Sequence, residues 1–143
     1  MTTRRLVSIV GLLLFQAAAA VSAHHAFSSE FDANKPVNLR GTVIKTEWVN
    51  PHSWIHIEVK DSQGKATSWA IECGAPNSLM RRGLNKNSIP IGTEIVVDGF
   101  QARDGSTTAN ARDITTPDGK KFFAGSSGTG APYDKDPDKD PPR

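Results

Sequence analysis

The segment SWIHIEVK, residues 53–60, alternates apolar and polar side chains without a break. In a β-strand, successive side chains point to opposite faces. One face would carry Ile55, Ile57 and Val59, and the other would carry Trp54, His56 and Glu58. A helix would need apolar residues every three to four positions, and the segment lacks that spacing. It therefore predicts a half-buried strand and directs the chain toward β structure.

Four more segments with strand composition, bounded by turn residues, extend this prediction. They are residues 37–48, 67–73, 93–101 and 108–115. Between the third and fourth strands stands APNSLMRRG, in which Asn77 or Ser78 is expected to cap a short helix. That helix would run to Arg82 and close at Gly83.

Three strands, a short helix and two strands follow the order of a five-stranded Greek-key barrel, the OB-fold. Gly41 inside the first strand and Gly99 at the end of the fourth stand where a small barrel needs a kink or bulge. The expected interior set is Ile55, Ile57, Val59, Ile71, Ile95 and Val97. An immunoglobulin-like sandwich is the competing all-β fold, but it needs about seven strands and no helix at this place. The sequence thus predicts an OB-like barrel over residues 24–124.

Residues 1–23 have the three parts of a secretory signal peptide. Arg4 and Arg5 precede an apolar run, and Val21 and Ala23 occupy the small-residue positions of a cleavage site. The apolar run is shorter than the ~20 residues that a transmembrane helix needs. We therefore expect export to the periplasm, cleavage after Ala23 and no membrane anchor in the mature protein. Ordinary secretion is favoured over twin-arginine export, because the flanking residues match that signal only loosely.

The charge of the mature chain argues against nucleic acid as a partner. The whole sequence has 17 basic and 15 acidic residues, and cleavage would remove two arginines, which leaves 15 of each. Nucleic-acid-binding domains concentrate basic charge on one face or groove, whereas this chain would be nearly neutral.

The C-terminal stretch, residues 125–143, is rich in Gly, Ser, Pro, Asp and Lys and has no apolar periodicity. Such a composition buries too little apolar surface to offset the entropy of ordering the chain. We therefore expect a disordered tail from Gly125 onward.

Five stretches of the mature chain carry a family resemblance. They are HHAFSSEFDANKPVNLRGTV, EWVNPHSWIHIEV, APNSLMRRG, IGTEIVVDGF and GSTTANARDITTPDGKKFFAGSS. They resemble a widespread bacterial family of small exported proteins that is known only as a domain of unknown function. The resemblance runs from His24 to about Ser127 and implies an exported domain in which His24–His25 and Asn50–Pro51–His52 belong together. It implies no activity.

The four histidines are the candidate metal ligands. Cleavage after Ala23 would make His24 the first residue, and its α-amine and imidazole together form a chelate that suits Cu(II). His25, His52 or His56 would supply a further nitrogen. His52 and His56 are about 13 Å apart in an extended strand, so both would reach one ion only if the chain bends between them. An isolated surface histidine, by contrast, is most often simply solvated.

A second candidate site follows from the fold. An OB-fold usually binds its ligand on the outer face of strands two and three and on the loop that joins strands one and two. In this chain that surface would hold Asn50, His52, Trp54, His56 and Glu58. Trp48 and Trp69 each continue an apolar face, so they are expected to fill the barrel.

The sequence offers no convincing catalytic constellation. Ser78 has no histidine or acid at a recognisable spacing, and Cys73, the only cysteine, is expected to point inward. Glu47, Glu58 and Glu72 form no convincing acid–base pair.

Two classes of function remain. The favoured class is a non-catalytic periplasmic module that binds a small ligand, a metal ion or a periplasmic protein. The alternative is a copper-binding protein that uses His24 with His52 or His56, with or without redox chemistry.

Overall fold

The structure is a computed structural model and describes residues 26–135. Six strands make up most of it: β1 (Phe31–Glu47), β2 (Trp54–Lys60), β3 (Ala66–Glu72), β4 (Glu94–Ala102), β5 (Thr108–Thr115) and β6 (Lys121–Phe123). Two short α-helices and a 3-10 helix accompany them: α2 (Ala26–Glu30), α3 (Pro76–Arg81) and η1 (Pro132–Lys135). The predicted signal peptide, together with His24 and His25, lies outside the described residues.

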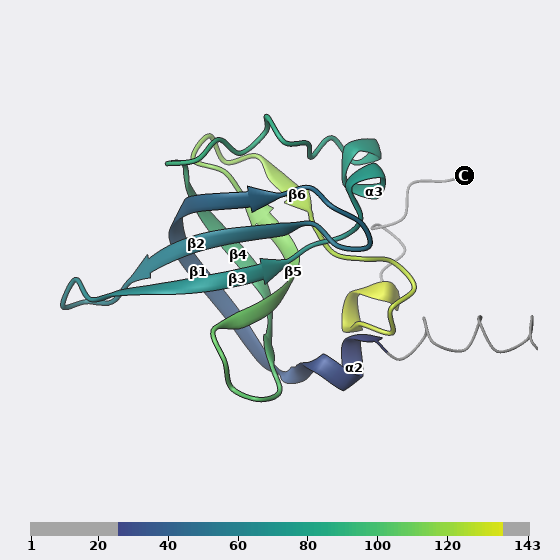
Figure 1. Ribbon diagram of the computed structural model, residues 1–143. Coiled ribbons are helices and arrows are strands. Elements are labelled where there is room, and N and C mark those ends of the chain that lie inside the picture. The colour runs from purple at the N-terminus through teal and green to yellow at the C-terminus, as the bar shows by residue number, and fades with distance from the viewer. Residues whose placement is uncertain (1–25, 136–143) are drawn as a thin grey trace, which may run out of the picture.

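The strands form one sheet that closes into a ring (Figure 1). Their order is β3-β2-β1-β4-β5-β6, and β3 also pairs with β5 in parallel, through Ala70–Glu72 and Thr108–Asn110. All other neighbours are antiparallel. The predicted all-β fold with OB-like strand order is therefore confirmed. The short strand β6 at the outer edge of β5 is an addition that the sequence did not predict.

Strand β1 belongs to both halves of the ring. Its first part pairs with β4 up to Thr42, and its last part pairs with β2 from Thr42 onward, with a register shift between Val43 and Lys45. Gly41 lies at this corner, where a Cβ atom would stand 2.8 Å from the backbone oxygen of Glu58. A glycine is needed there because the two strands approach too closely for a side chain.

A second corner lies at Gly99, where the register between β4 and β5 shifts after Asp98. A Cβ atom at Gly99 would collide with the backbone oxygen of Asn110. The expected bulge is present, and β4 continues through it to Ala102, one residue beyond the predicted end of the strand at Gln101.

The ring encloses the predicted core. Of the six predicted interior residues, five are no more than 1% exposed, namely Ile55, Ile57, Ile71, Ile95 and Val97, and the sixth, Val59, packs partly buried against them. Trp48 and Trp69 also pack against this core from partly buried positions. The alternation predicted for β2 and β3 therefore has the correct register.

Helix α3 lies between β3 and β4, as predicted, but it begins earlier than expected. Pro76 opens it, and Ala75 occupies the N-cap position without a side-chain hydrogen bond. Proline suits the first helical turn because its missing N–H would have no partner there. Gly83 follows the helix with φ +83°, in the left-handed conformation that favours glycine. No helix within residues 26–135 has the length and hydropathy to cross a membrane.

An aromatic cluster on the outside of the ring holds α2 and the C-terminal segment. Its buried members are Phe27, Phe31, Ala102, Ala131 and Tyr133, and Phe100 and Phe123 pack against them. The rings of Phe27 and Phe100 meet edge to face at 5.6 Å, and those of Phe123 and Tyr133 at 5.3 Å. Figure 1 shows α2, α3 and η1 at the same end of the strands.

The sequence-based prediction therefore placed the start of the disordered tail, Gly125, too early in the chain. Residues 126–135 pack against the ring through Ala131 and Tyr133, which are buried in the aromatic cluster. The polar composition of the segment as a whole gives no sign of these two apolar contacts. The Asp134 carboxylate accepts hydrogen bonds from the backbone N–H groups of Gly128, Gly130 and Ala131. These bonds satisfy a turn that would otherwise have unpaired donors.

The opposite end of the ring carries the β2–β3 hairpin (Figure 1). Its turn, residues 61–65, is fixed by the Asp61 carboxylate, which accepts hydrogen bonds from the backbone N–H groups of Gln63 and Lys65. Gly64 adopts φ +80° there, and a Cβ atom would meet nothing within 4 Å.

Replacing Tyr133 by alanine should test whether the C-terminal segment belongs to the folded domain. Tyr133 is 4% exposed and its ring contacts three other aromatic rings, so Tyr133→Ala should lower the free energy of unfolding by about 3 kcal/mol. Urea denaturation measures the loss. Pro132→Ala is the matched control, because Pro132 is exposed in the same segment. Equal stability of the two variants would contradict the packing described for this segment.

Candidate functional site

A groove lies on the outside of the ring between two loops. The loop of residues 48–53 joins β1 to β2, and the loop of residues 103–107 joins β4 to β5. The groove consists of two cavities that share Glu30 and Trp54 as lining residues. The His52 cavity has a volume of about 340 Å³, and the Arg103 cavity has a volume of about 360 Å³. We call the two together the Trp54 groove.

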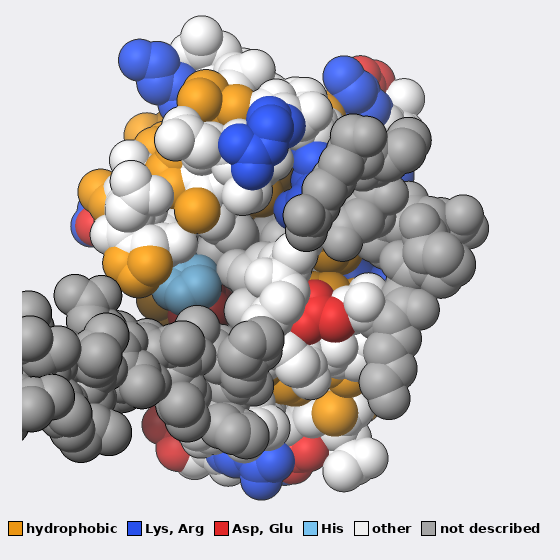
Figure 2. All heavy atoms as spheres, turned by 90° about the vertical axis from the view of Figure 1, so that its right-hand side faces the viewer, with side chains coloured by type: hydrophobic (Ala, Val, Ile, Leu, Met, Phe, Trp, Pro, Cys, Tyr) orange, Lys and Arg blue, Asp and Glu red, His pale blue; other side chains and the backbone are white. Residues whose placement is uncertain are grey.

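Figure 2 views the end of the ring where α2 and η1 lie. A histidine side chain is visible on this face among apolar side chains, and acidic side chains are exposed nearby. The His52 cavity combines the same kinds of residue. It is lined by Phe27, Val49 and Pro51 together with Glu30, His52 and Glu72.

The pairing of β2 with β3 places two of the lining residues opposite each other. Ile55 and Ile71 are partners inside the ring, so the preceding pair, Trp54 and Glu72, falls on the outer face. Glu30 reaches the same groove from α2, which the aromatic cluster holds against β1 and β4. The site is thus assembled from three parts of the chain that are far apart in sequence.

His52 is held by its Nδ1 atom. Nδ1 lies 3.3 Å from the backbone oxygen of Cys73, 3.3 Å from Oγ of Ser126 and 3.8 Å from Oε1 of Glu72. A carbonyl oxygen only accepts, so the contact with Cys73 assigns the hydrogen to Nδ1. No hydrogen bond within residues 26–135 reaches the other ring nitrogen, Nε2. In the neutral ring, Nε2 is therefore available as an acceptor or a metal ligand.

Glu72 is a buried carboxylate at the base of the His52 cavity. It is 7% exposed, and its Oε1 accepts a hydrogen bond of 3.0 Å from Nδ2 of Asn110. Asn110 in turn accepts a hydrogen bond of 2.6 Å from the hydroxyl of Tyr133. Burial raises the pKa of Glu72, and the neighbouring His52 and the bond from Asn110 partly offset that rise. The carboxylate is thus fixed in place while its charge remains incompletely compensated.

The predicted ligand-binding residues separate into two groups. Asn50, His52 and Trp54 line the His52 cavity together. His56 and Glu58 lie further along β2 and line neither cavity of the groove. Nε2 of His56 stands 2.9 Å from Oε2 of Glu47, and Glu58 lies 3.9 Å from the amine of Lys60.

Several groove residues escaped the sequence-based prediction, among them Glu72, Glu30, Arg103 and Asp104. Glu72 could have been found, because a hairpin turn at residues 61–65 pairs Lys60 with Ala66 and therefore Trp54 with Glu72. Glu30 gave no such signal, because it reaches the groove only through the tertiary packing of Phe27 and Phe31.

The described residues do not form a metal site by themselves. Within residues 26–135, no three His, Cys, Asp or Glu side chains gather closely enough to hold an ion. The predicted ligands His24 and His25 lie outside the described residues, whereas His52 and His56 contact different acids, Glu72 and Glu47.

The sequence profile of a family of unknown function, DUF6152, matches residues 12–111. The chain belongs to DUF6152. No curated protein matches it. The match includes the groove residues Glu30, His52, Trp54 and Glu72 and stops before Tyr133.

The cysteine of this DUF6152 chain is not part of the groove. Cys73 is fully buried in the core, as predicted, and burial raises the pKa of its thiol above the ordinary value. A protonated, inaccessible thiol is a poor nucleophile and a poor metal ligand.

A third cavity of about 410 Å³ lies beside α3 and shares no lining residue with the groove. Trp48, Pro76 and Met80 line it, and Met80 is 53% exposed. Its wall is mostly apolar and contains one charged residue, Lys86. Within residues 26–135, the Trp54 groove differs from this cavity because its wall contains a buried carboxyl group, that of Glu72.

Replacing Glu72 by glutamine should change how stability depends on pH. Because the pKa of Glu72 is raised in the folded protein, binding of a proton to this carboxyl group stabilises the fold. This contribution to the free energy of unfolding is fully present below the ordinary carboxyl pKa and is lost as pH rises through the raised pKa. Glutamine keeps an oxygen for Asn110 but does not titrate. Glu72→Gln should therefore exceed the wild type at neutral pH by a free energy of unfolding on the order of 1 kcal/mol.

Urea denaturation of both proteins between about pH 4 and about pH 8 tests this expectation. A repeat at high salt is the control, because salt screens exposed charges more strongly than buried ones. A stability difference between the two proteins that stays constant across this range would contradict the raised pKa.

Proposed function

We propose that the protein is an exported, non-catalytic module that binds a small ligand in the Trp54 groove. The observation that supports the proposal most directly is that two cavities share Trp54 and Glu30 and so extend one groove across the outer face of β2 and β3. Small-molecule sites are concave and combine apolar walls with a few placed polar groups. The groove has both features.

The position of the groove supports a binding role. In an OB-like ring, ligands usually contact strands two and three together with the loop between strands one and two and the loop between strands four and five. The His52 cavity borders the first loop through Asn50 and Pro51, and the Arg103 cavity borders the second loop through Asp104 and Ser106. Fold alone does not name a ligand, so the proposal depends on the residues in the groove.

Export is part of the same proposal. Residues 1–23 have the pattern of a signal peptide, and cleavage after Ala23 would deliver a chain that starts at His24. A periplasmic location would expose the groove to small solutes and metal ions.

A fragment screen by NMR should locate binding at Trp54. We expect weakly binding small molecules to shift the indole N–H signal of Trp54 and the backbone signals of Asn50 and Thr108, which line the groove. Trp54→Leu should weaken these fragments by about tenfold, because the indole forms a wall of both cavities.

Met80→Ala is the matched control, because Met80 lines the separate cavity beside α3. If the fragments shift Trp48 and respond to Met80→Ala while Trp54 stays unchanged, the proposed site is wrong.

A second candidate function is copper binding through His24 and His52. Two features favour it. The Nδ1 contact of His52 leaves Nε2 as the ring nitrogen for a metal, an arrangement that is common for metal-binding histidines. Phe27, which lines the same cavity as His52, is three residues after His24, and three residues span at most about 11 Å. His56 is the weaker partner, because Glu47 already contacts its Nε2.

Copper affinity should depend on both the free α-amine of His24 and the ring of His52. Mass spectrometry first establishes whether the exported chain starts at His24, since any other start removes the amine chelate. Cu(II) titration against a competing chelator then compares the native chain with a Gly-Ser extension before His24 and with His52→Ala. Each change should weaken binding by about tenfold or more, because each removes a nitrogen ligand.

His56→Ala is the control and should bind copper like the native chain. If the extended chain binds as tightly as the native one, copper does not use the N-terminus and this candidate fails.

A further inference from the structure

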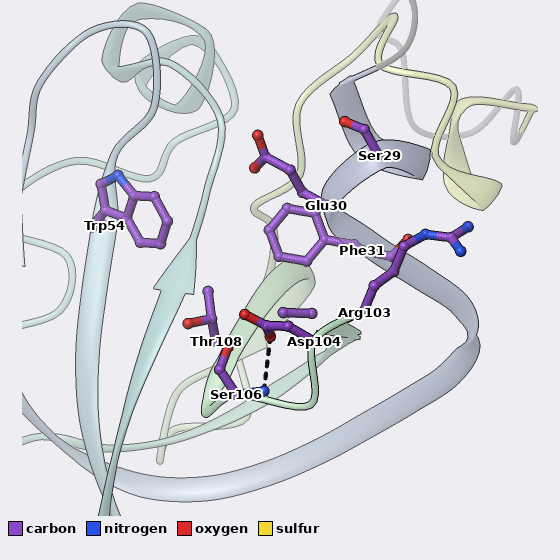
Figure 3. A pocket seen from close by; sticks show the side chains of 9 residues that line it. Ser29, Glu30, Phe31, Trp54, Arg103, Asp104, Ser106 and Thr108 are labelled. Atoms are coloured by element: carbon purple, nitrogen blue, oxygen red, sulfur yellow. Dashed lines mark hydrogen bonds between the residues drawn. The ribbon is translucent and has the colours of Figure 1, made fainter.

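The charges of the Trp54 groove are unbalanced. Its walls contain the carboxyl groups of Glu30, Glu72 and Asp104 and, as the opposing permanent charge, Arg103. Figure 3 shows the carboxyl groups of Glu30 and Asp104 on the side of the cavity that faces Trp54, whereas the Arg103 guanidinium extends away from Trp54. The Arg103 side chain is held there by a bond from Nε to the backbone oxygen of Phe31. The part of the groove beside Trp54 is therefore acidic.

One of these carboxyl groups has an unused acceptor. Glu72 is more than nine-tenths buried, and only its Oε1 accepts a hydrogen bond, from Asn110. Within residues 26–135, no donor contacts Oε2 of Glu72. Oε2 is not fully enclosed, so a donor that enters the cavity can reach it and add a charge-assisted hydrogen bond to this mostly buried carboxylate.

Trp54 defines the shape that such a donor must have. Its indole lines both cavities, the one that contains Glu72 and His52 and the one that contains Asp104 and Thr108. An aromatic face attracts a cation and also packs against a flat apolar group. Glu30 lies on α2, Glu72 on β3 and Asp104 on the loop after β4. Within residues 26–135, no three such side chains are close enough together to hold a metal ion. This arrangement suits an extended ligand.

We infer that the Trp54 groove binds an organic ammonium, with its N–H donors directed to Glu72 and Glu30 and its apolar body against the indole of Trp54. This inference rests on the proposed binding function and specifies its ligand class. Asp104 adds to the attraction, because the hydrogen bond from the Ser106 backbone N–H holds the pKa of this carboxyl below its ordinary value and keeps it ionised.

Three probes of similar shape and different charge test the inference on the chain that starts at His24. Phenethylamine is a cation at neutral pH, 2-phenylethanol is neutral and 3-phenylpropanoate is an anion. Titration followed by the Trp54 indole N–H signal should show that phenethylamine binds at least about tenfold more tightly than either of the others. Glu30→Gln and Glu72→Gln should each weaken phenethylamine by about threefold or more, with little effect on 2-phenylethanol.

Glu58→Gln is the matched control, because Glu58 lies on β2 outside both cavities. Glu30 is exposed, so Glu30→Gln tests the charge even if a change at the buried Glu72 disturbs folding. Tight binding of phenethylamine that neither glutamine variant weakens would overturn the inference.

The outcomes also separate this inference from the proposed function. Equal or tighter binding of 2-phenylethanol or 3-phenylpropanoate at Trp54 would overturn the ammonium ligand and leave a binding module in place. Failure of all three probes to shift Trp54 would likewise overturn the inference, and the fragment screen then decides separately whether the groove binds ligands at all.

Discussion

The parallel pairing of β3 with β5 is the contact on which the rest of the structure depends. It closes the ring and sets Glu72 beside Asn110, the partners at one end of that pairing. Asn110 then bonds to both Glu72 and Tyr133, so one residue links the ring, the groove and the C-terminal segment. Without this closure, β3 would remain an edge strand and the groove would lose its acidic base.

Much of the fold could be predicted from the sequence, because alternation in strands is a local property. The register of β2 follows from Ile55 and Ile57, and the order of strands and helix follows from turn residues such as Gly83 and Gly105. The packed C-terminal segment could not be predicted in this way. A few apolar residues, among them Tyr133, fix it in place, and their partners on α2 and β4 are distant in sequence.

The candidate site was predicted only in part for the same reason. Asn50, His52 and Trp54 belong to a loop and strand whose position in an OB-like ring is known in advance. The position of Glu30 in the groove depends on how α2 packs against the ring, and no local sequence pattern predicts that packing. His56 was grouped with these residues because it shares a strand face with Trp54. It lies two residues further along β2, however, and its Nε2 contacts a different acid, Glu47.

The β2–β3 hairpin offers a practical means of handling the molecule. Its turn at residues 61–65 is exposed and is stabilised by its own Asp61 bonds, and it lies at the opposite end of the strands from α2 and η1 (Figure 1). A fluorophore or a surface tether at Gln63 would leave both ends of the chain untouched. Immobilised in this orientation, the protein would present the Trp54 groove to a flowing solution, and neither chain terminus would need a tag.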